Sequence, residues 1–141
     1  SIGVEKSPII GSKLTGLGAK RHCVFYDGSS VVEEIVEYDV GQRIKVTLSE
    51  FSMPLKCMSA NFYIRKLDEK SCEVTIQIAF TVKYGPLGAL IGMLMMRPIL
   101  KGVQKKLLAG LAYHAFTGNL VGSELPSNDA LAPSFAYLIL I

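Results

Sequence analysis

The chain has 141 residues, of which 50% are hydrophobic and 19% are charged, and its formal net charge is +3. This length suits one domain with a single core, and the composition excludes a disordered polar chain. Its lysines are scattered and form no basic stripe interleaved with aromatic residues, so nucleic acid is not an expected partner. Cys23, Cys57 and Cys72 cannot all pair and show no CxxC spacing, which predicts reduced thiols in a cytoplasmic protein.

Alternation of apolar and polar residues predicts a series of antiparallel strands before residue 85. They are expected, in chain order, near Ile2–Ile10 and at Ala19–Tyr26, Val31–Tyr38, Arg43–Phe51, Cys57–Lys66 and Glu73–Tyr84. Asp27-Gly28 favours a tight hairpin turn, and Pro54 indicates that Ser52–Lys56 is a loop or an edge. In the last strand every second residue from Val74 to Val82 is apolar, which is typical of a strand with one buried face. Successive hairpins then predict a meander with one apolar face.

A long helix is predicted over Tyr84–Phe116, after the strands. Pro98 cannot donate a hydrogen bond to the carbonyl of Leu94, so a kink or break is expected there. Leu87–Met96 carries no charge and is apolar on every side, which indicates that it is enclosed or contacts lipid or a ligand. It has about half of the ~20 residues needed to span a bilayer, so a transmembrane helix is not expected, whereas an interfacial one stays open. Lys101, Lys105 and Lys106 are interpreted as a solvated face.

Two parts of the chain are distinguished by composition. Residues 1–118 are expected to form the strand-and-helix domain, and residues 119–141 a loop followed by the apolar tail Ser134–Ile141. A long helix that follows an antiparallel meander indicates a curved sheet around the helix, with space between them for an apolar molecule. The methionines of the helix suit either an adaptable pocket or ordinary core filling.

Several short motifs recur at spacings typical of one superfamily. They are Gly18-Ala19-Lys20-Arg21, Asp27-Gly28 followed by Glu33, Asp39, Glu50 followed by Pro54, and Gly85-Pro86-Leu87-Gly88 before the helix. With these motifs the chain resembles, from Gly16 to Phe116, the polyketide cyclase/dehydrase-like branch of the START-like (Bet v 1-like, SRPBCC) superfamily. The resemblance implies an α+β helix-grip fold, in which a seven-stranded antiparallel sheet wraps around a long C-terminal helix and encloses a hydrophobic cavity. Members bind or transport lipids, quinones, sterols, hormones and polyketides, and a minority are enzymes.

The start of the chain departs from the family pattern. The family begins with a strand and two short helices, for which this chain has no room, so the resemblance implies a domain that begins at the second strand. In the family the first strand pairs beside the last, and its loss would leave the edge of Glu73–Tyr84 open. We therefore expect Ser134–Ile141 to fill that edge as an added strand, in its own chain or in that of a homodimer partner.

The candidate ligand contacts lie on the expected inner surfaces of sheet and helix. Arg21 and Glu50 are the polar candidates, and Glu50 shares the strand parity of the apolar residues before it. For each, the alternative is a surface ion pair. The apolar candidates are Ala60, Phe62, Ile64, Ile76, Ile78, Phe80, Leu90, Ile91, Leu94 and Met95. A tryptophan at Leu94 is expected to block such a cavity.

The leading functional hypothesis is binding or transport of a hydrophobic small molecule, such as a lipid, a quinone or a polyketide-like compound. No cofactor is expected, and no metal site either, because no Cys/His/Asp cluster has zinc spacing. One alternative is a polyketide cyclase or aromatase that uses Arg21, Glu50, Tyr63 or Tyr84 in proton transfer. The other is an oligomeric interaction module without a ligand.

Overall fold

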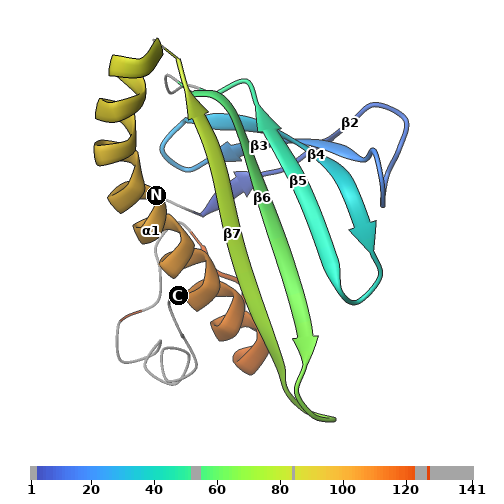
Figure 1. Ribbon diagram of the computed structural model, residues 1–141. Helices are drawn as coiled ribbons and strands as arrows, with labels where there is room; N and C mark the ends of the chain where they lie inside the picture. The colour runs from blue at the N-terminus through green and yellow to red at the C-terminus, as the bar shows by residue number, and fades with distance from the viewer. Residues whose placement is uncertain (1–2, 52–54, 84, 123–126, 128–141) are drawn as a thin grey trace.

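The computed structural model describes residues 3–51, 55–83, 85–122 and 127 (Figure 1). Within these residues, strands come first and one long helix follows. The elements are β1 (Val4–Lys6), β2 (Ile9–Ile10), β3 (Lys20–Phe25), β4 (Ser30–Asp39), β5 (Arg43–Ser49), β6 (Leu55–Lys66), β7 (Cys72–Val82) and α1 (Gly85–Thr117). This open antiparallel sheet of 7 strands with a C-terminal helix confirms the α+β, helix-grip-like expectation.

The strands form one sheet with the order β1-β3-β4-β5-β6-β7, and β2 pairs with β3. Each strand from β3 to β7 lies beside its neighbour in the sequence, so the expected meander is confirmed. The segment expected near Ile2–Ile10 contains two short strands, both on β3. β6 begins at Leu55, inside the segment Ser52–Lys56 expected to be a loop or an edge, because Leu55 pairs with Val82 and is buried. Among the described residues β7 is an edge strand of this sheet. The tail Ser134–Ile141, which is expected to pair with this edge, lies outside the described residues.

The cross-strand register divides the sheet into an apolar and a polar face. One row of directly paired residues consists of Ile35, Val46, Ala60 and Ile78. A row on the opposite face consists of Glu37, Lys45, Asn61 and Gln77. Successive side chains of a strand point to opposite faces, so the period-two pattern of the sequence appears directly as these rows. The apolar face is the one that meets the helix.

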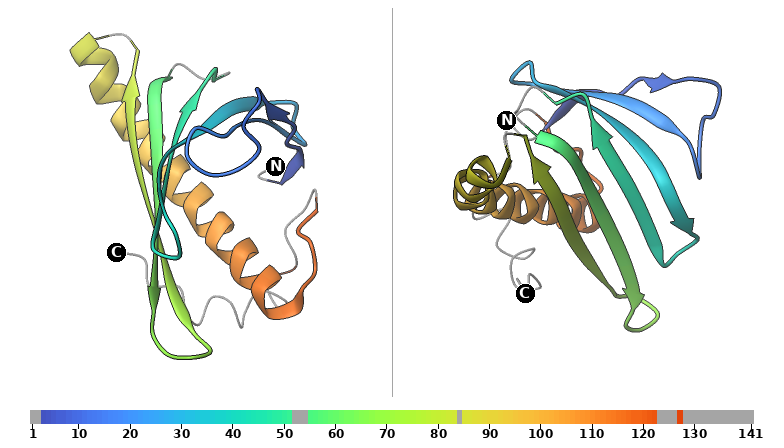
Figure 2. Two further views of the ribbon diagram at one scale, coloured as in Figure 1. Left: turned by 90° about the vertical axis from the view of Figure 1, so that its right-hand side faces the viewer. Right: turned by 45° about the horizontal axis from the view of Figure 1, so that its top comes forward.

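The core lies where α1 crosses the end of the sheet. Leu55, Met96 and Leu100 form a buried cluster, and partly buried residues of the sheet, Met58, Ile78, Phe80 and Val82, pack against it together with Phe51. Figures 1 and 2 show α1 running along β7, which it contacts directly. The helix therefore covers the β6–β7 end of the apolar face.

The helix continues through Pro98 without a break. Figure 1 shows that its axis changes direction about midway along its length, and Pro98 lies in this middle part. The bend has the expected cause, since proline removes one i→i−4 hydrogen bond and its ring crowds the preceding turn. Before the bend, α1 approaches β7 so closely that a Cβ atom on Gly92 would lie 2.7 Å from Cγ2 of Val82.

Candidate functional site

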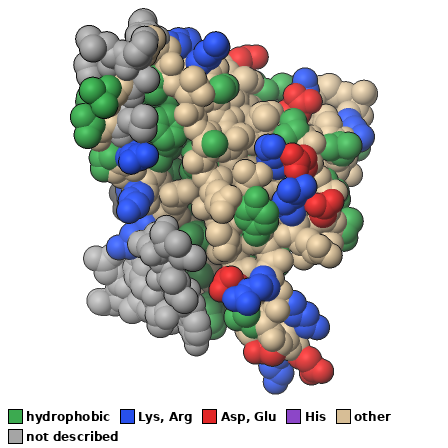
Figure 3. All heavy atoms as spheres, in the orientation of Figure 1, with side chains coloured by type: hydrophobic (Ala, Val, Ile, Leu, Met, Phe, Trp, Pro, Cys, Tyr) green, Lys and Arg blue, Asp and Glu red, His purple; other side chains and the backbone are tan. Residues whose placement is uncertain are grey.

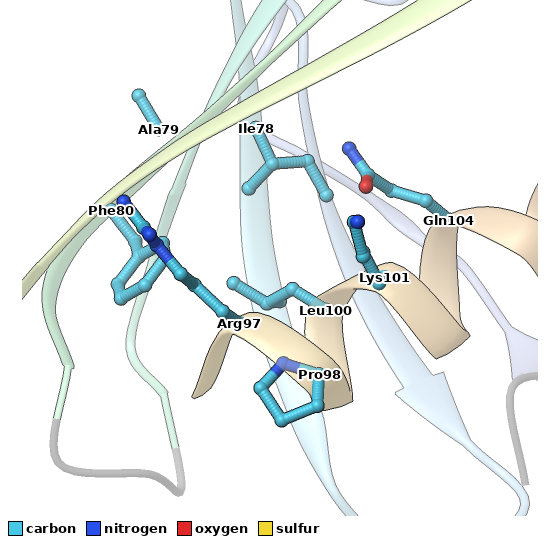
Figure 4. A pocket seen from close by; sticks show the side chains of 8 residues that line it. All are labelled: Ile78, Ala79, Phe80, Arg97, Pro98, Leu100, Lys101 and Gln104. Carbon is cyan, nitrogen blue, oxygen red and sulfur yellow. The ribbon is translucent and has the colours of Figure 1, made fainter. Parts of the chain in front are cut away.

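A groove of about 670 Å³ lies between β7 and the middle of α1. Its lining residues are Ile78, Ala79 and Phe80 from the strand, and Arg97, Pro98, Leu100, Lys101 and Gln104 from the helix (Figure 4). In Figure 4 the side chains of Ile78 and Leu100 lie between the strand and the helix. The groove thus combines an apolar interior with nitrogen donors on its helical side.

Local geometry explains why these residues meet. Ile78 and Phe80 are two apart in β7, so both project to the helix side of the sheet. Arg97, Lys101 and Gln104 have the spacing i, i+4 and i+7, which places them on one side of an α-helix. The groove is therefore formed by one strand face and one helix face and needs no loop residue among those described.

Gln104 connects the two walls of the groove. Its Nε2 donates a hydrogen bond to the carbonyl oxygen of Ile76 at 3.3 Å. An edge strand leaves some backbone groups without a partner strand, and a helix side chain that satisfies one of them stabilises the contact between helix and sheet. Gln104 therefore holds α1 against β7 at one end of the groove.

The two cations of the groove are not neutralised by the protein in the part that the structure describes. Arg97 and Lys101 are both exposed, and neither forms an ion pair with a carboxylate among the described residues. Ion pairs between described residues of the sheet join neighbouring strands, as between Lys45 and Glu37. The groove is therefore a positively charged part of the surface with an apolar interior.

Of the apolar candidates predicted from the sequence, Ile78 and Phe80 line the groove. The other strand candidates share that face of the sheet but do not line the groove: Ala60 is buried, Phe62 and Ile76 are half-buried, and Ile64 is exposed. The side chain of Ile91 lies outside the part of the chain that the structure describes.

The remaining helix candidates lie elsewhere than expected. Leu90, Leu94 and Met95 are 60%, 72% and 62% exposed, and none of them lines the groove. The reason is helical geometry: Met96 packs into the core, and Leu94, two residues earlier, points about 160° away at 3.6 residues per turn. A tryptophan at Leu94 would accordingly leave this groove open.

Arg21 lies on the apolar face of the sheet but pairs with a carboxylate there. The row across the sheet that contains it consists of Arg21, Glu33, Leu48, Met58 and Phe80. Its Nη2 lies 2.6 Å from Oε2 of Glu33. Partial burial lowers the pKa of the Arg21 guanidinium, but the charge and hydrogen bond of Glu33 outweigh this, so the pKa is raised overall. Arg21 is thus occupied by an ion pair, four strands away from the groove.

The other polar candidates also lie away from the groove. Glu50 follows the last residue of β5 with a φ of 57°, so the strand parity that would direct it inward ends at Ser49. Tyr63 pairs with Arg43 and Thr75 on the polar face of the sheet. Tyr84 lies outside the described residues. None of the described candidates for proton transfer lines the groove.

Sequence reasoning missed the groove residues of the helix, namely Arg97, Pro98, Leu100, Lys101 and Gln104. The i, i+4, i+7 spacing of Arg97, Lys101 and Gln104 was a usable signal, since it aligns three nitrogen donors beside Leu100. Lys101, interpreted as part of a solvated face, is exposed and also lines the groove.

Comparisons with known proteins place this chain in a family. The sequence model described as polyketide cyclase / dehydrase and lipid transport matches residues 5–115, and the chain belongs to this family. The comparison with curated proteins returned no match.

Two solved structures are similar to part of this chain. One is an uncharacterized protein from Bacillus thuringiensis, 19% identical, with a TM-score of 0.42 over 69% of this chain and 74% of the other. The second is the protein XoxI from Bacillus cereus, 17% identical, with a TM-score of 0.46 over 74% of this chain and 72% of the other. In the described part of the chain, no helix combines the length and hydropathy needed to cross a membrane.

Proposed function

We propose that this protein binds or transports a hydrophobic small molecule in the groove between β7 and α1. The observation that carries the proposal is the groove itself, in which Ile78, Phe80 and Leu100 offer apolar surface beside nitrogen donors. Its volume of about 670 Å³ is within the range of known ligand sites. Membership in a family described by polyketide cyclisation and lipid transport supports the same class of ligand.

The binding energy would come mainly from burial of apolar surface. A ligand that buries about 300 Å² of apolar surface would gain about 7 kcal/mol at ~25 cal/mol per Å². Loss of translational and rotational freedom would offset roughly 4 kcal/mol or more of this gain. Apolar contact alone therefore gives weak binding, and polar groups of the groove are needed for useful affinity.

Those polar groups favour a ligand with an acidic end. Arg97 and Lys101 bring two positive charges to one side of the groove, with no carboxylate paired to either among the described residues. A charge-assisted hydrogen bond from such a donor is about twice as strong as a neutral one. A lipid-like chain with a carboxylate or phosphate end would place its chain against Ile78 and Phe80 and its charge near Arg97 and Lys101. A neutral quinone would use the apolar surface alone.

A pair of tryptophan variants in the same helix tests this placement. Gln104→Trp fills the groove, whereas Leu94→Trp adds the same ring on the exposed side of α1. With a fluorescent long-chain fatty acid as probe, we expect Gln104→Trp to weaken binding about tenfold or more and Leu94→Trp to leave binding near that of the wild type. Far-ultraviolet circular dichroism of both variants controls for folding. Equal affinities of folded Gln104→Trp and wild type would place the ligand elsewhere.

A second measurement addresses the ligand class directly. A native mass spectrum of gently purified protein, compared with the denatured mass, would reveal a retained lipid-like compound as an added mass that disappears on denaturation. Retention that is lost in Gln104→Trp but kept in Leu94→Trp would support the groove as its site. Turnover of a poly-keto substrate that survives Gln104→Trp would contradict the carrier proposal and favour an enzyme with its site elsewhere.

A further inference from the structure

Exposed apolar side chains lie along the first half of α1. Leu90, Leu94, Met95 and Ile99 are each at least half exposed, and they lie within ten consecutive residues. At 1.5 Å per residue this stretch is about 15 Å long. Single exposed leucines are ordinary on a protein surface, but Leu90 and Leu94, at i and i+4, are neighbours on one side of the helix. Adjoining exposed apolar side chains indicate a contact surface.

Positive charge follows this apolar stretch along the same helix. α1 contains Arg97, Lys101, Lys105 and Lys106 and no aspartate or glutamate in its 33 residues. Leu90, Leu94, Arg97 and Lys101 have the spacing i, i+4, i+7 and i+11, so two leucines and two cations share one side of the helix. Figure 3 shows the same arrangement on the surface, with hydrophobic side chains over the upper part of the helix and Lys and Arg below them. We call these four residues, Leu90, Leu94, Arg97 and Lys101, the outer helix face; Met95 and Ile99 lie about 140° and 180° around the helix from Leu90.

We propose that the outer helix face docks on the surface of an anionic lipid bilayer, with α1 lying along the interface. Such a surface offers an apolar layer for the exposed leucines and negative headgroups for the neighbouring cations. The contact is interfacial, because α1 lacks the combination of length and hydropathy that crossing requires. The face meets both requirements of a bilayer surface at once, within one helix.

A second copy of the chain fits this face less well. An interface between two copies of the outer helix face would bring Arg97 and Lys101 of one helix near the same two cations of the other, with no carboxylate on either helix. Like charges placed close together in a contact cost free energy, and they cost more once water is excluded. Charge complementarity therefore favours anionic lipid over self-association.

The outer helix face adjoins the groove. Arg97 and Lys101 belong to both, so a docked helix holds this side of the groove near the bilayer surface. This docking goes beyond the proposed ligand binding and does not depend on it, because the argument uses only the exposed residues of α1.

Vesicle flotation with the full chain tests the proposal. We compare vesicles of phosphatidylcholine alone with vesicles of phosphatidylcholine and phosphatidylserine. The wild type should bind the vesicles that contain phosphatidylserine, and added NaCl should weaken the binding. Each cation near an anionic surface contributes about fivefold to binding, so Arg97→Gln combined with Lys101→Gln should weaken it more than tenfold.

The apolar part of the contact has its own matched variants. Leu90→Asp combined with Leu94→Asp should reduce binding about tenfold or more without unfolding the protein, since both side chains are exposed. Leu14→Asp combined with Leu67→Asp makes the same chemical change at exposed leucines elsewhere and should bind as the wild type does.

Three results would overturn the proposal. The first is absence of binding to phosphatidylserine vesicles by the folded wild type. The second is equal binding by the Leu90/Leu94 and Leu14/Leu67 double variants. The third is a dimer, seen in sedimentation equilibrium, that Leu94→Asp dissociates while vesicle binding persists unchanged, which would assign the outer helix face to a second copy.

Discussion

Two glycines of α1 should respond differently to the same substitution. A Cβ atom on Gly92 would lie 2.7 Å from Cγ2 and 2.9 Å from Cγ1 of Val82, closer than real Cβ contacts. Val82 cannot easily yield, because a β-branched side chain is restricted at χ1. A Cβ atom on Gly102 would have nothing within 4 Å. The helix therefore needs glycine at residue 92 and not at residue 102.

The magnitudes follow from two opposing contributions. Replacing glycine with alanine inside a helix stabilises by about 1 kcal/mol. Gly102→Ala should show this gain in full and raise Tm by about 4 °C for a chain of this size. At Gly92 the same gain is opposed by overpacking against Val82, which costs about 1–3 kcal/mol. Gly92→Ala should therefore be less stable than Gly102→Ala by about 1–3 kcal/mol.

Thermal and urea unfolding followed by circular dichroism measure this difference. A double-mutant cycle with Val82→Ala isolates the contact, since Gly92→Ala should be better tolerated once the valine methyl groups are gone. Gly102→Ala in the Val82→Ala background is the control and should show no coupling. If Gly92→Ala and Gly102→Ala raised Tm equally, α1 would not approach β7 as described, and the groove beside this contact would have to be revised.

Three further predictions concern other parts of the chain. Hydrogen bonds from the hydroxyl and backbone N–H of Ser29 lower the pKa of the Asp27 carboxyl to about 2. The stability that this carboxylate contributes is therefore fully present above its pKa in the unfolded chain, and it is lost as pH falls through about 2. Ser29→Ala should move that pKa toward the usual value in an NMR titration, and an unmoved pKa would contradict the assignment. Burial raises the pKa of the Cys23 thiol, so a thiol reagent should label exposed Cys57 and Cys72 first. Early labelling of Cys23 in the folded protein would contradict its burial. Deletion of residues 134–141 should change the oligomeric state or solubility if the tail covers the edge of β7, and an unchanged sedimentation profile would exclude that role.

The sheet could be predicted from the sequence because its faces differ in polarity. In β7 the alternation from Val74 to Val82 assigns each side chain to one face, and the observed rows follow it. Glu33 and Glu34 are adjacent in β4 and belong to different rows, Glu33 opposite Leu48 and Glu34 opposite Thr47. A period-two pattern carries this information wherever one face is buried and the other is solvated.

The site could not be predicted to the same extent, for two physical reasons. Leu87–Met96 is apolar on every side, so its periodicity cannot tell which side meets the sheet. Glu50 has a positive φ, which is uncommon for a residue other than glycine and leaves no mark in the apolar–polar pattern. Three expected pocket residues of the helix therefore lie on its outer side, and Glu50 lies beyond the end of its strand.

A glycine of α1 indicates which side of the helix meets the sheet. Gly92, Met96 and Leu100 have the spacing i, i+4 and i+8, and together they form the side of α1 that meets β7 and the core. A search for hydrophobic stripes passes over Gly92, yet close approach of backbone to strand is what a helical glycine permits and a larger residue prevents. Once Gly92 is against Val82, Leu94 must point outward and Leu100 toward Ile78. The stability of Gly92→Ala therefore tests more than one contact. It depends on how α1 is rotated about its own axis, and that rotation also determines which residues line the groove and which are available to a lipid surface.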